Sequence, residues 1–238
     1  MSEGLKENNF IVKLFSIREN IFKMLSNRGY AESIKKYYAD STLAEFKKAY
    51  KQNNISMYLY KEHTDPDKKD KKELTQCIVY FVNPMSRVGK VKQQFMKLMA
   101  TLEDTFDTDA DYVDMIMIAE DRDKNIFMHS ISKYVKGYQQ TYNNTKSASH
   151  ELTMELFYYS EVSFNITDHY LVPRHELMDK EHVTEILERF KCSRDQLPKI
   201  SKDDPVSKYY GAKIGDVFKI YRKSPTAGLA EYYRLVTL

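Results

Sequence analysis

The final third of the chain restricts its own backbone more tightly than any other stretch. Asp204-Pro205 places a helix N-cap directly before a proline at the first helical position, and Gly211 stands where a short helix would end. Gly215-Asp216 is typical of a turn, and Leu197-Pro198 favours an extended backbone. These signals predict a short helix set between extended segments.

A longer helix and a hairpin complete this predicted unit. Asp179 is a suitable N-cap for a helix whose apolar stripe consists of Val183, Ile186, Leu187 and Phe190. Residues 217–222 and 229–236 are rich in β-branched and aromatic side chains, and the turn-forming segment 224–228 separates them. A strand, a helix, a one-turn helix and a hairpin predict a compact α+β unit.

The same residues resemble the assembly domain of the fifth subunit shared by the nuclear RNA polymerases of eukaryotes, a subunit that the archaeal RNA polymerase also has. The resemblance runs from about Asn165 to the end of the chain. The matching strings are Leu171-Val172-Pro173-x-His175, Gln196-Leu197-Pro198-Lys199-Ile200, Asp204-Pro205-Val206, Tyr209-Tyr210-Gly211, Lys219-Ile220, Thr226-Ala227-Gly228 and Tyr233-Arg234.

The preceding residues resemble, more faintly, the N-terminal jaw domain of the eukaryotic subunit. The strings that carry this are Leu14-Phe15-x-Ile17-Arg18, Arg28-Gly29-Tyr30, Val79-Tyr80-Phe81 and Val88-Gly89-Lys90. The archaeal subunit has no such domain, so the resemblance implies a chain of the eukaryotic type. One departure concerns the tip that faces DNA. Where the family tends to have a Thr-Pro pair, this chain has Asp121-Arg122-Asp123-Lys124.

Hydrophobic periodicity predicts a mixed N-terminal domain with a small, partly parallel sheet flanked by helices. Gly29 is expected to end the first helix and Ser41 to cap the second. The expected helices cover 10–28, 41–50, 86–102 and 125–136; the expected strands cover 55–61, 76–82, 113–119, 154–159 and 161–166; a loop is expected at 138–149. The predicted architecture is α+β in two domains, a jaw domain over 1–163 and an assembly domain over 164–238.

Composition favours an intracellular protein. No apolar run approaches the roughly 20 residues needed to span a bilayer, and the first residues lack the apolar core of a signal peptide. The two cysteines form no metal pattern, and Cys77 in an apolar run is expected to be a core residue.

Charge is unevenly distributed, although the net charge is only +3. Between Ser86 and Leu102 no acid occurs, while Arg87, Lys90, Lys92 and Lys97 do. With Arg122 and Lys124, these cations are candidates for contact with DNA phosphates. The alternative is a solvated helix face.

The sequence gives little support to catalysis. The cluster Asp107, Asp109, Asp111 and Asp114 precedes a strand, where acids often serve as caps. Asp67-x-Lys69 and Asp70-x-Lys72 match a nuclease-like pattern only within a Lys/Asp-rich run. His169, His175 and His182 are spaced too widely for a typical zinc site. We therefore expect no catalytic residue, no metal and no cofactor.

The resemblance implies a non-catalytic structural subunit of a multisubunit DNA-directed RNA polymerase. The chain would dock on the largest subunit and form part of the lower jaw near downstream duplex DNA, beside other polymerase subunits. We expect no membrane and no small-molecule substrate. The expected compartment is the nucleus, or the host cytoplasm or virion for a viral chain. The alternative is a free-standing nucleic-acid-binding or regulatory module.

The docking candidates combine residues that shape the backbone with polar residues suited to an interface. Arg222 and Arg234 lie in facing strands, and the alternative for both is pairing with acids inside the module. The full set is Pro173, His175, Gln196, Pro198, Pro205, Tyr209, Gly211, Arg222, Thr226, Gly228 and Arg234.

Overall fold

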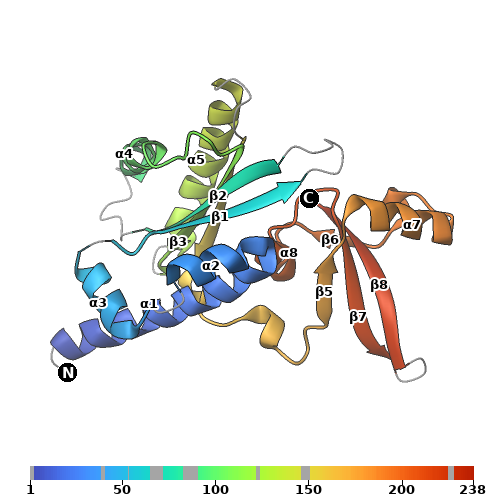
Figure 1. Ribbon diagram of the computed structural model, residues 1–238, viewed down its shortest axis with the longest axis horizontal. Coiled ribbons are helices and arrows are strands. Elements are labelled where there is room, and N and C mark those ends of the chain that lie inside the picture. The colour runs from blue at the N-terminus through green and yellow to red at the C-terminus, as the bar shows by residue number, and fades with distance from the viewer. Residues whose placement is uncertain are drawn as a thin grey trace. The chain divides into compact units, whose positions relative to one another are not determined.

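Two compact units make up the chain, residues Met1–Ser163 and Phe164–Leu238. A computed structural model describes residues 3–38, 41–52, 54–64, 72–82, 91–121, 124–145, 151–224 and 228–238. Each unit combines helices with one four-stranded sheet (Figure 1). The predicted α+β class is confirmed.

The N-terminal unit carries a mixed sheet with strand order β1-β2-β3-β4, in which β1 is antiparallel to β2 and the other pairs are parallel. Its elements are α1 (Glu3–Leu25), η1 (Ser26–Tyr30), α2 (Ala31–Tyr38), α3 (Leu43–Lys51), β1 (Met57–Thr64), β2 (Lys72–Phe81), α4 (Val91–Glu103), β3 (Tyr112–Ala119), α5 (Lys124–Thr145), β4 (Glu151–Tyr158) and α6 (Tyr159–Val162).

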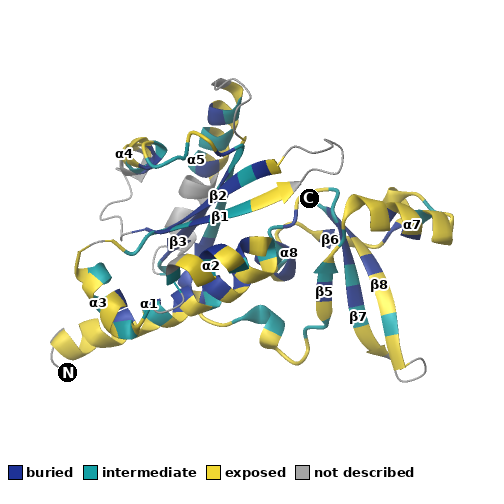
Figure 2. Ribbon diagram, viewed as in Figure 1, coloured by how far each residue is buried: buried dark blue, intermediate teal, exposed yellow. Residues whose placement is uncertain are grey.

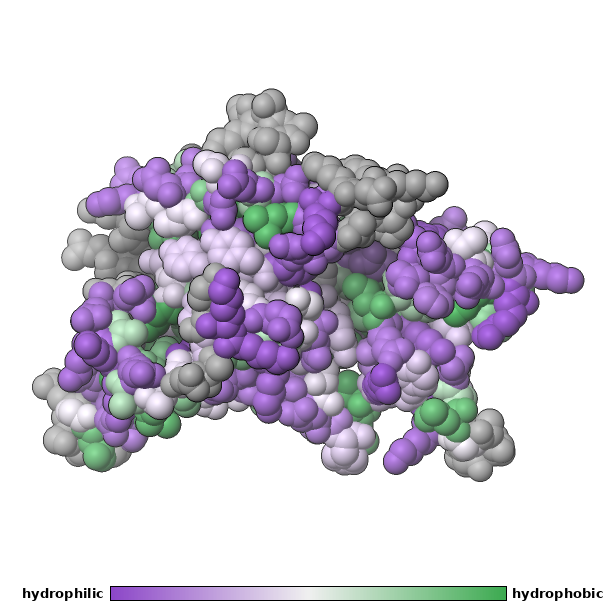
Figure 3. Space-filling model, in the orientation of Figure 1, coloured by the Kyte–Doolittle hydropathy of each residue, from purple (hydrophilic) through white to green (hydrophobic). Residues whose placement is uncertain are grey.

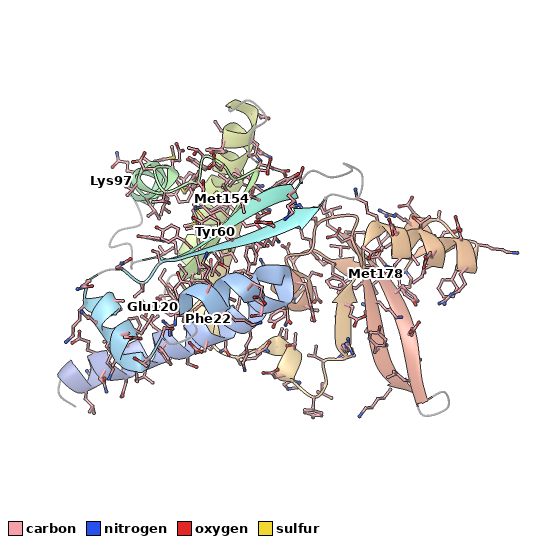
Figure 4. All side chains as sticks on the ribbon, in the orientation of Figure 1. Phe22, Tyr60, Lys97, Glu120, Met154 and Met178 are labelled. Carbon is pink, nitrogen blue, oxygen red and sulfur yellow. The ribbon has the colours of Figure 1, made fainter. Side chains whose placement is uncertain are left out.

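The central strands β2 and β3 are buried on both faces, as their apolar runs predict (Figure 2). Phe95 and Met99 of α4 and Tyr142 of α5 pack on one face with Met154 of β4, which Figure 4 labels. The loop predicted at 138–149 is wrong over 138–145, because α5 continues to Thr145; residues 146–149 lie outside the described residues. Tyr138 and Tyr142 lie one helical turn apart and both pack on this core, so burial overrides the polar local sequence.

One local prediction in the first helices is confirmed and another is corrected. Gly29 breaks the first helix with φ 94°, as predicted, but α2 follows at once, which the sequence analysis does not predict. Thr42, not Ser41, caps the next helix. Its hydroxyl accepts the Glu45 N–H, and the Glu45 carboxylate accepts the Thr42 N–H, a reciprocal capping box. Ser41 instead donates to the Tyr38 carbonyl.

The extended segment predicted at 161–166 is also wrong. The short helix α6 begins after β4, and the Glu161 carboxylate accepts the N–H of Tyr158 at its start.

No helix in the described ranges combines the length and the apolar character that crossing a bilayer requires.

The C-terminal unit carries a sheet of order β5-β7-β8-β6. In it β7 is antiparallel to both β5 and β8, and β6 is parallel to β8. The elements are η4 (Ile166–Asp168), β5 (Arg174–Leu177), α7 (Lys180–Phe190), η5 (Arg194–Gln196), β6 (Lys199–Ser201), α8 (Pro205–Tyr210), β7 (Val217–Ser224) and β8 (Gly228–Thr237).

The predicted caps of this unit are confirmed. Asp179 accepts the N–H of His182, and Asp204 accepts that of Val206, with Pro205 at the first helical position. Gly211 ends α8 in the left-handed region at φ 64°. One member of the predicted apolar stripe does not fit, because Phe190 is 50% exposed and only its ring edge meets Tyr233.

Candidate docking surface

The two faces of the C-terminal sheet differ in their chemistry. Directly opposed residues in a sheet share a face. His175, Ile220 and Tyr232 form one such row, and Leu177, Phe218 and Arg234 form the next. Phe218 and Ile220 pack with Tyr210 and Ala212 of the α8 region. We call this side the α8 face: His175, Leu177, Phe218, Ile220, Arg222, Ala230, Tyr232 and Arg234.

The opposite side, the α7 face, combines an apolar core with several polar groups that are paired within the unit. Val217, Tyr233 and Leu235 form a core there with α7. Further along the strands, the Tyr221 hydroxyl donates to Glu176 at 2.7 Å, and Lys219 lies 2.6 Å from Glu231. The Tyr233 hydroxyl also donates to Glu231. Glu176, Lys219 and Glu231 are therefore paired within the unit, whereas Lys199 and Lys223 on the same side are exposed.

His175 occupies the inner part of the α8 face. It is 9% exposed, its Nδ1 lies 2.7 Å from the Pro173 carbonyl oxygen, and its ring meets Phe218 edge-on at 5.8 Å. Burial lowers the pKa of His175; the Pro173 carbonyl and Asp204 act against this, and Arg234 adds to it. The environment thus favours a neutral imidazole that holds the turn before β5.

The outer part of the α8 face carries two exposed arginines. Arg222 lies with its guanidinium 5.3 Å from the centre of the Tyr232 ring, and that tyrosine is 46% exposed. Arg234 stands opposite Phe218 in the register. Neither arginine has an ion-pair partner among the described residues, so the predicted alternative of acids within the module is not seen there. Cations beside an exposed aromatic ring suit an acidic and apolar protein surface.

Several other predicted docking residues set the shape of the backbone. The Pro198 carbonyl accepts the N–H of Leu235 at 2.8 Å and so begins the pairing of β6 with β8. Gln196 accepts the Ser193 N–H in a capping box. Gly228 has φ 70° where β8 begins. Pro173, Pro205 and Gly211 have the backbone roles given above.

Tyr209 and Thr226 complete the predicted docking set. Tyr209 is buried, and its ring lies 5.2 Å from that of Tyr210, so it helps to hold α8 in place. Thr226 lies outside the described residues.

The predicted phosphate contacts are only partly described. Lys97 is exposed on α4, on the side away from the packed Phe95 and Met99 (Figure 4). Lys92 and Lys124 lie in α4 and α5, but their side chains are outside the described part of the structure. Arg87, Lys90 and Arg122 are also outside it. The structure therefore does not bring these six cations together as one described surface.

The carboxylates of Asp107, Asp111 and Asp114 have structural partners, whereas only the backbone N–H of Asp109 has one. Asp114 accepts the Tyr30 hydroxyl at 2.9 Å, Asp111 accepts the Leu74 N–H, and Asp107 accepts the Asp109 N–H. Asp67 and Asp70 lie outside the described residues. Within the described ranges, no group of three His, Cys, Asp or Glu side chains is arranged to hold a metal ion.

His169, His182 and Cys77 each lie in separate surroundings and do not share a common site. His169 accepts the Leu171 N–H, and His182 lies 2.7 Å from Asp179. Cys77 is a free, buried thiol in β2, and burial raises its pKa. These observations agree with structural roles for all three.

Two arginines of the N-terminal motifs make contacts within their own unit. Arg18 is buried, with its guanidinium 4.6 Å from the Phe15 ring centre and 4.8 Å from that of Phe46. Arg28 forms an ion pair with Glu155 at 2.8 Å. The resembling strings around Arg18 and Arg28 are thus positions where this unit holds itself together.

Sequence reasoning missed Leu177, Phe218 and Tyr232 as members of the α8 face. The alternation within 217–222 and 229–236 contained the signal, because every second residue shares a face. The sequence did not show which alternate set would face α8.

Comparison with known proteins supports the resemblance. The family model described as RNA polymerase Rpb5, C-terminal domain, matches residues 164–236. The Methanocaldococcus jannaschii DNA-directed RNA polymerase subunit Rpo5 is 58% identical over 71 residues, which cover 30% of this chain and 91% of that protein.

A eukaryotic relative matches both units. The Dictyostelium discoideum protein named DNA-directed RNA polymerases I, II, and III subunit rpabc1 is 33% identical over 229 residues, covering 94% of this chain and 98% of that protein. The chain therefore belongs to the Rpb5 family of RNA polymerase subunits, in the eukaryotic form that adds an N-terminal extension to the part shared with archaea.

Proposed function

We propose that this chain is a non-catalytic structural subunit of a multisubunit DNA-directed RNA polymerase and acts in the nucleus. Its C-terminal unit docks on the largest subunit through the α8 face. Its N-terminal unit forms part of the lower jaw near downstream duplex DNA, where cations such as Lys97 meet phosphates without reading sequence.

The observation that carries this proposal is the free pair of arginines on the α8 face. Arg222 and Arg234 are exposed beside a half-exposed tyrosine, while Glu176, Lys219 and Glu231 of the opposite face have partners within the unit. A face that leaves cations and an aromatic ring exposed suits a protein partner.

A non-catalytic role is supported by the work that the candidate acids already do. Asp111 accepts the N–H of Leu74, Asp114 accepts the hydroxyl of Tyr30, and Asp107 accepts the N–H of Asp109. Each is therefore committed to holding an element in place.

The test compares charge reversal at the two proposed interfaces. Arg234→Glu is expected to reduce incorporation into polymerase reconstituted with the largest subunit by about tenfold or more, because it removes a docking cation and adds repulsion. Lys97→Glu is expected to leave incorporation unchanged and to weaken DNA binding by the assembled enzyme.

Two outcomes would overturn the proposal. One is normal assembly of the Arg234→Glu variant. The other is strong, salt-dependent binding of duplex DNA by the isolated chain without any affinity for the large subunits, which would favour the free-standing module.

A further inference from the structure

The outer edge of β8 lacks a neighbouring strand over most of its length. β8 spans Gly228–Thr237, whereas β6 spans only Lys199–Ser201 and pairs with Leu235 to Thr237. Among the described residues, no strand lies beside the outer edge between Leu229 and Tyr233. Figure 1 shows β7 and β8 continuing as a hairpin beyond the short β6.

The hydrogen bonds near the end of β8 show which backbone groups point outward. Leu235 donates to the Pro198 carbonyl on the β6 side, while Val236 donates to the Asp216 carbonyl on the β7 side. Because these directions alternate along a strand, Leu229, Glu231 and Tyr233 also point toward the β6 side. Their N–H and C=O groups therefore lie on that edge and take no part in the pairing with β7; Leu229 and Glu231 are exposed, whereas Tyr233 is 7% exposed.

Side chains cap some backbone groups on both edges of the N-terminal sheet. On β4, Asn143 accepts the Leu152 N–H at 2.9 Å and donates to the Leu152 carbonyl at 3.1 Å. On β1, Tyr38 and Ser33 accept the N–H groups of Tyr58 and Tyr60. The described residues supply no such cap along β8 from Leu229 to Tyr233, although an open edge invites pairing with another chain.

We propose that this edge receives an extended segment of the partner polymerase subunit, which adds a strand in line with β6. The proposal rests on the proposed function and names the way in which the docking surface is used. Backbone bonds to Leu229, Glu231 and Tyr233 would supply affinity, and the flanking side chains would supply specificity.

The side chains of β8 define the chemistry of that segment. On the α8 face the added strand would lie beside Tyr232 and Arg234, with Arg222 one strand further, so acidic side chains fit there. On the α7 face it would lie beside the exposed Leu229 and beside Glu231, which Lys219 already neutralises, so apolar side chains fit. Apolar surface gathers at the end of the hairpin in Figure 3. The occupant is therefore an extended segment that alternates acidic and apolar residues.

Charge disfavours a second copy of this chain as the occupant. An antiparallel pair centred on Glu231 would place two Glu231 carboxylates opposite each other, and like charges in that arrangement are destabilising.

The experiment measures amide hydrogen exchange of the full chain, free and reconstituted with the largest and other subunits of its own polymerase. Assembly is expected to slow exchange at Leu229, Glu231 and Tyr233. The amides of Ala230 and Tyr232 pair with β7 and should be slow in both states, which gives an internal control.

A matched pair of variants tests the backbone contact. Glu231→Pro and Glu231→Ala both lose the carboxylate that pairs with Lys219, but only the proline removes the outward N–H. Incorporation is expected to fall about tenfold further for the proline variant than for the alanine variant. Lys223→Pro, directly opposite Leu229 but with its N–H on the other edge of the hairpin, should assemble normally.

The outcomes separate the two proposals. Strand addition is wrong if the chain assembles while the three amides still exchange fast and the two Glu231 variants are incorporated equally well. Docking on the α8 face would then stand. If the chain does not assemble with the polymerase at all, both proposals fail. Protection that appears only on concentration of the isolated chain would identify a second copy as the occupant and would also overturn the inference.

Discussion

The two units treat their polar groups in opposite ways. The N-terminal unit partly buries the Arg28–Glu155 ion pair and caps edge groups of β4 with Asn143. The C-terminal unit leaves Arg222 and Arg234 exposed and one side of β8 open. Most of the large apolar side chains that remain exposed in the described residues also belong to this smaller unit. This difference agrees with the proposal that the smaller unit is the docking part of the chain.

The largest expected effect breaks the internal pairing of the N-terminal unit. Arg28→Ala leaves Glu155 without its partner in a mostly buried site and should lower the free energy of unfolding by about 3 kcal/mol. Urea denaturation measures this. Arg174→Ala removes an exposed pair with Glu176 and should change stability by less than about 0.5 kcal/mol. Equal losses in the two variants would contradict the comparison.

A smaller effect is expected from opening an edge that is now capped. Asn143→Leu leaves both the N–H and the C=O of Leu152 without their side-chain partner and should cost about 1–2 kcal/mol. Assembly of the surviving folded protein should not change. A loss of assembly with unchanged stability would show that this edge also serves a partner.

Substitution of one glycine in each unit should change the stability by a similar or smaller amount. Gly211→Ala forces a left-handed conformation at φ 64° on an L-residue and should destabilise the C-terminal unit by about 1 kcal/mol. Gly137→Ala is the matched control, because it lies inside α5 and an added Cβ would meet nothing within 4 Å. It should stabilise the N-terminal unit by about 0.5–1 kcal/mol. Thermal unfolding of both variants distinguishes these signs.

The smallest expected effect is on the pH dependence of stability. Because burial lowers the pKa of His175 in the folded state, the unfolded chain binds more protons as the pH falls below about 6.5. Stability should therefore decrease from pH 7 to pH 5, and His175→Gln should show a shallower decrease. Asp179 raises the pKa of His182, which acts in the opposite direction in both proteins, so only the difference between them is informative. Parallel pH profiles for the two proteins would refute this role of His175.

Signals contained within a few residues are predictable from the sequence. Asp179, Asp204-Pro205 and Gly211 are recognisable as caps because each acts on backbone groups within one turn. The capping box of Thr42 and Glu45 has the same short range and a readable pattern, although the prediction names Ser41 instead. The loop predicted at 138–149 fails for a different reason, since only packing against the sheet keeps Tyr138 and Tyr142 helical.

The sequence by itself determined the family and the α+β class. It also determined the helix caps and turns of the C-terminal unit, because each depends on contacts within a few residues. Only the tertiary structure decided that Arg28 meets Glu155, that His175 is buried while Arg234 is exposed, and that β6 stops short of covering β8. Those features depend on strand register and on contacts between residues far apart in the chain. No local pattern encodes them, because a shift of one residue in register would turn each side chain to the opposite face.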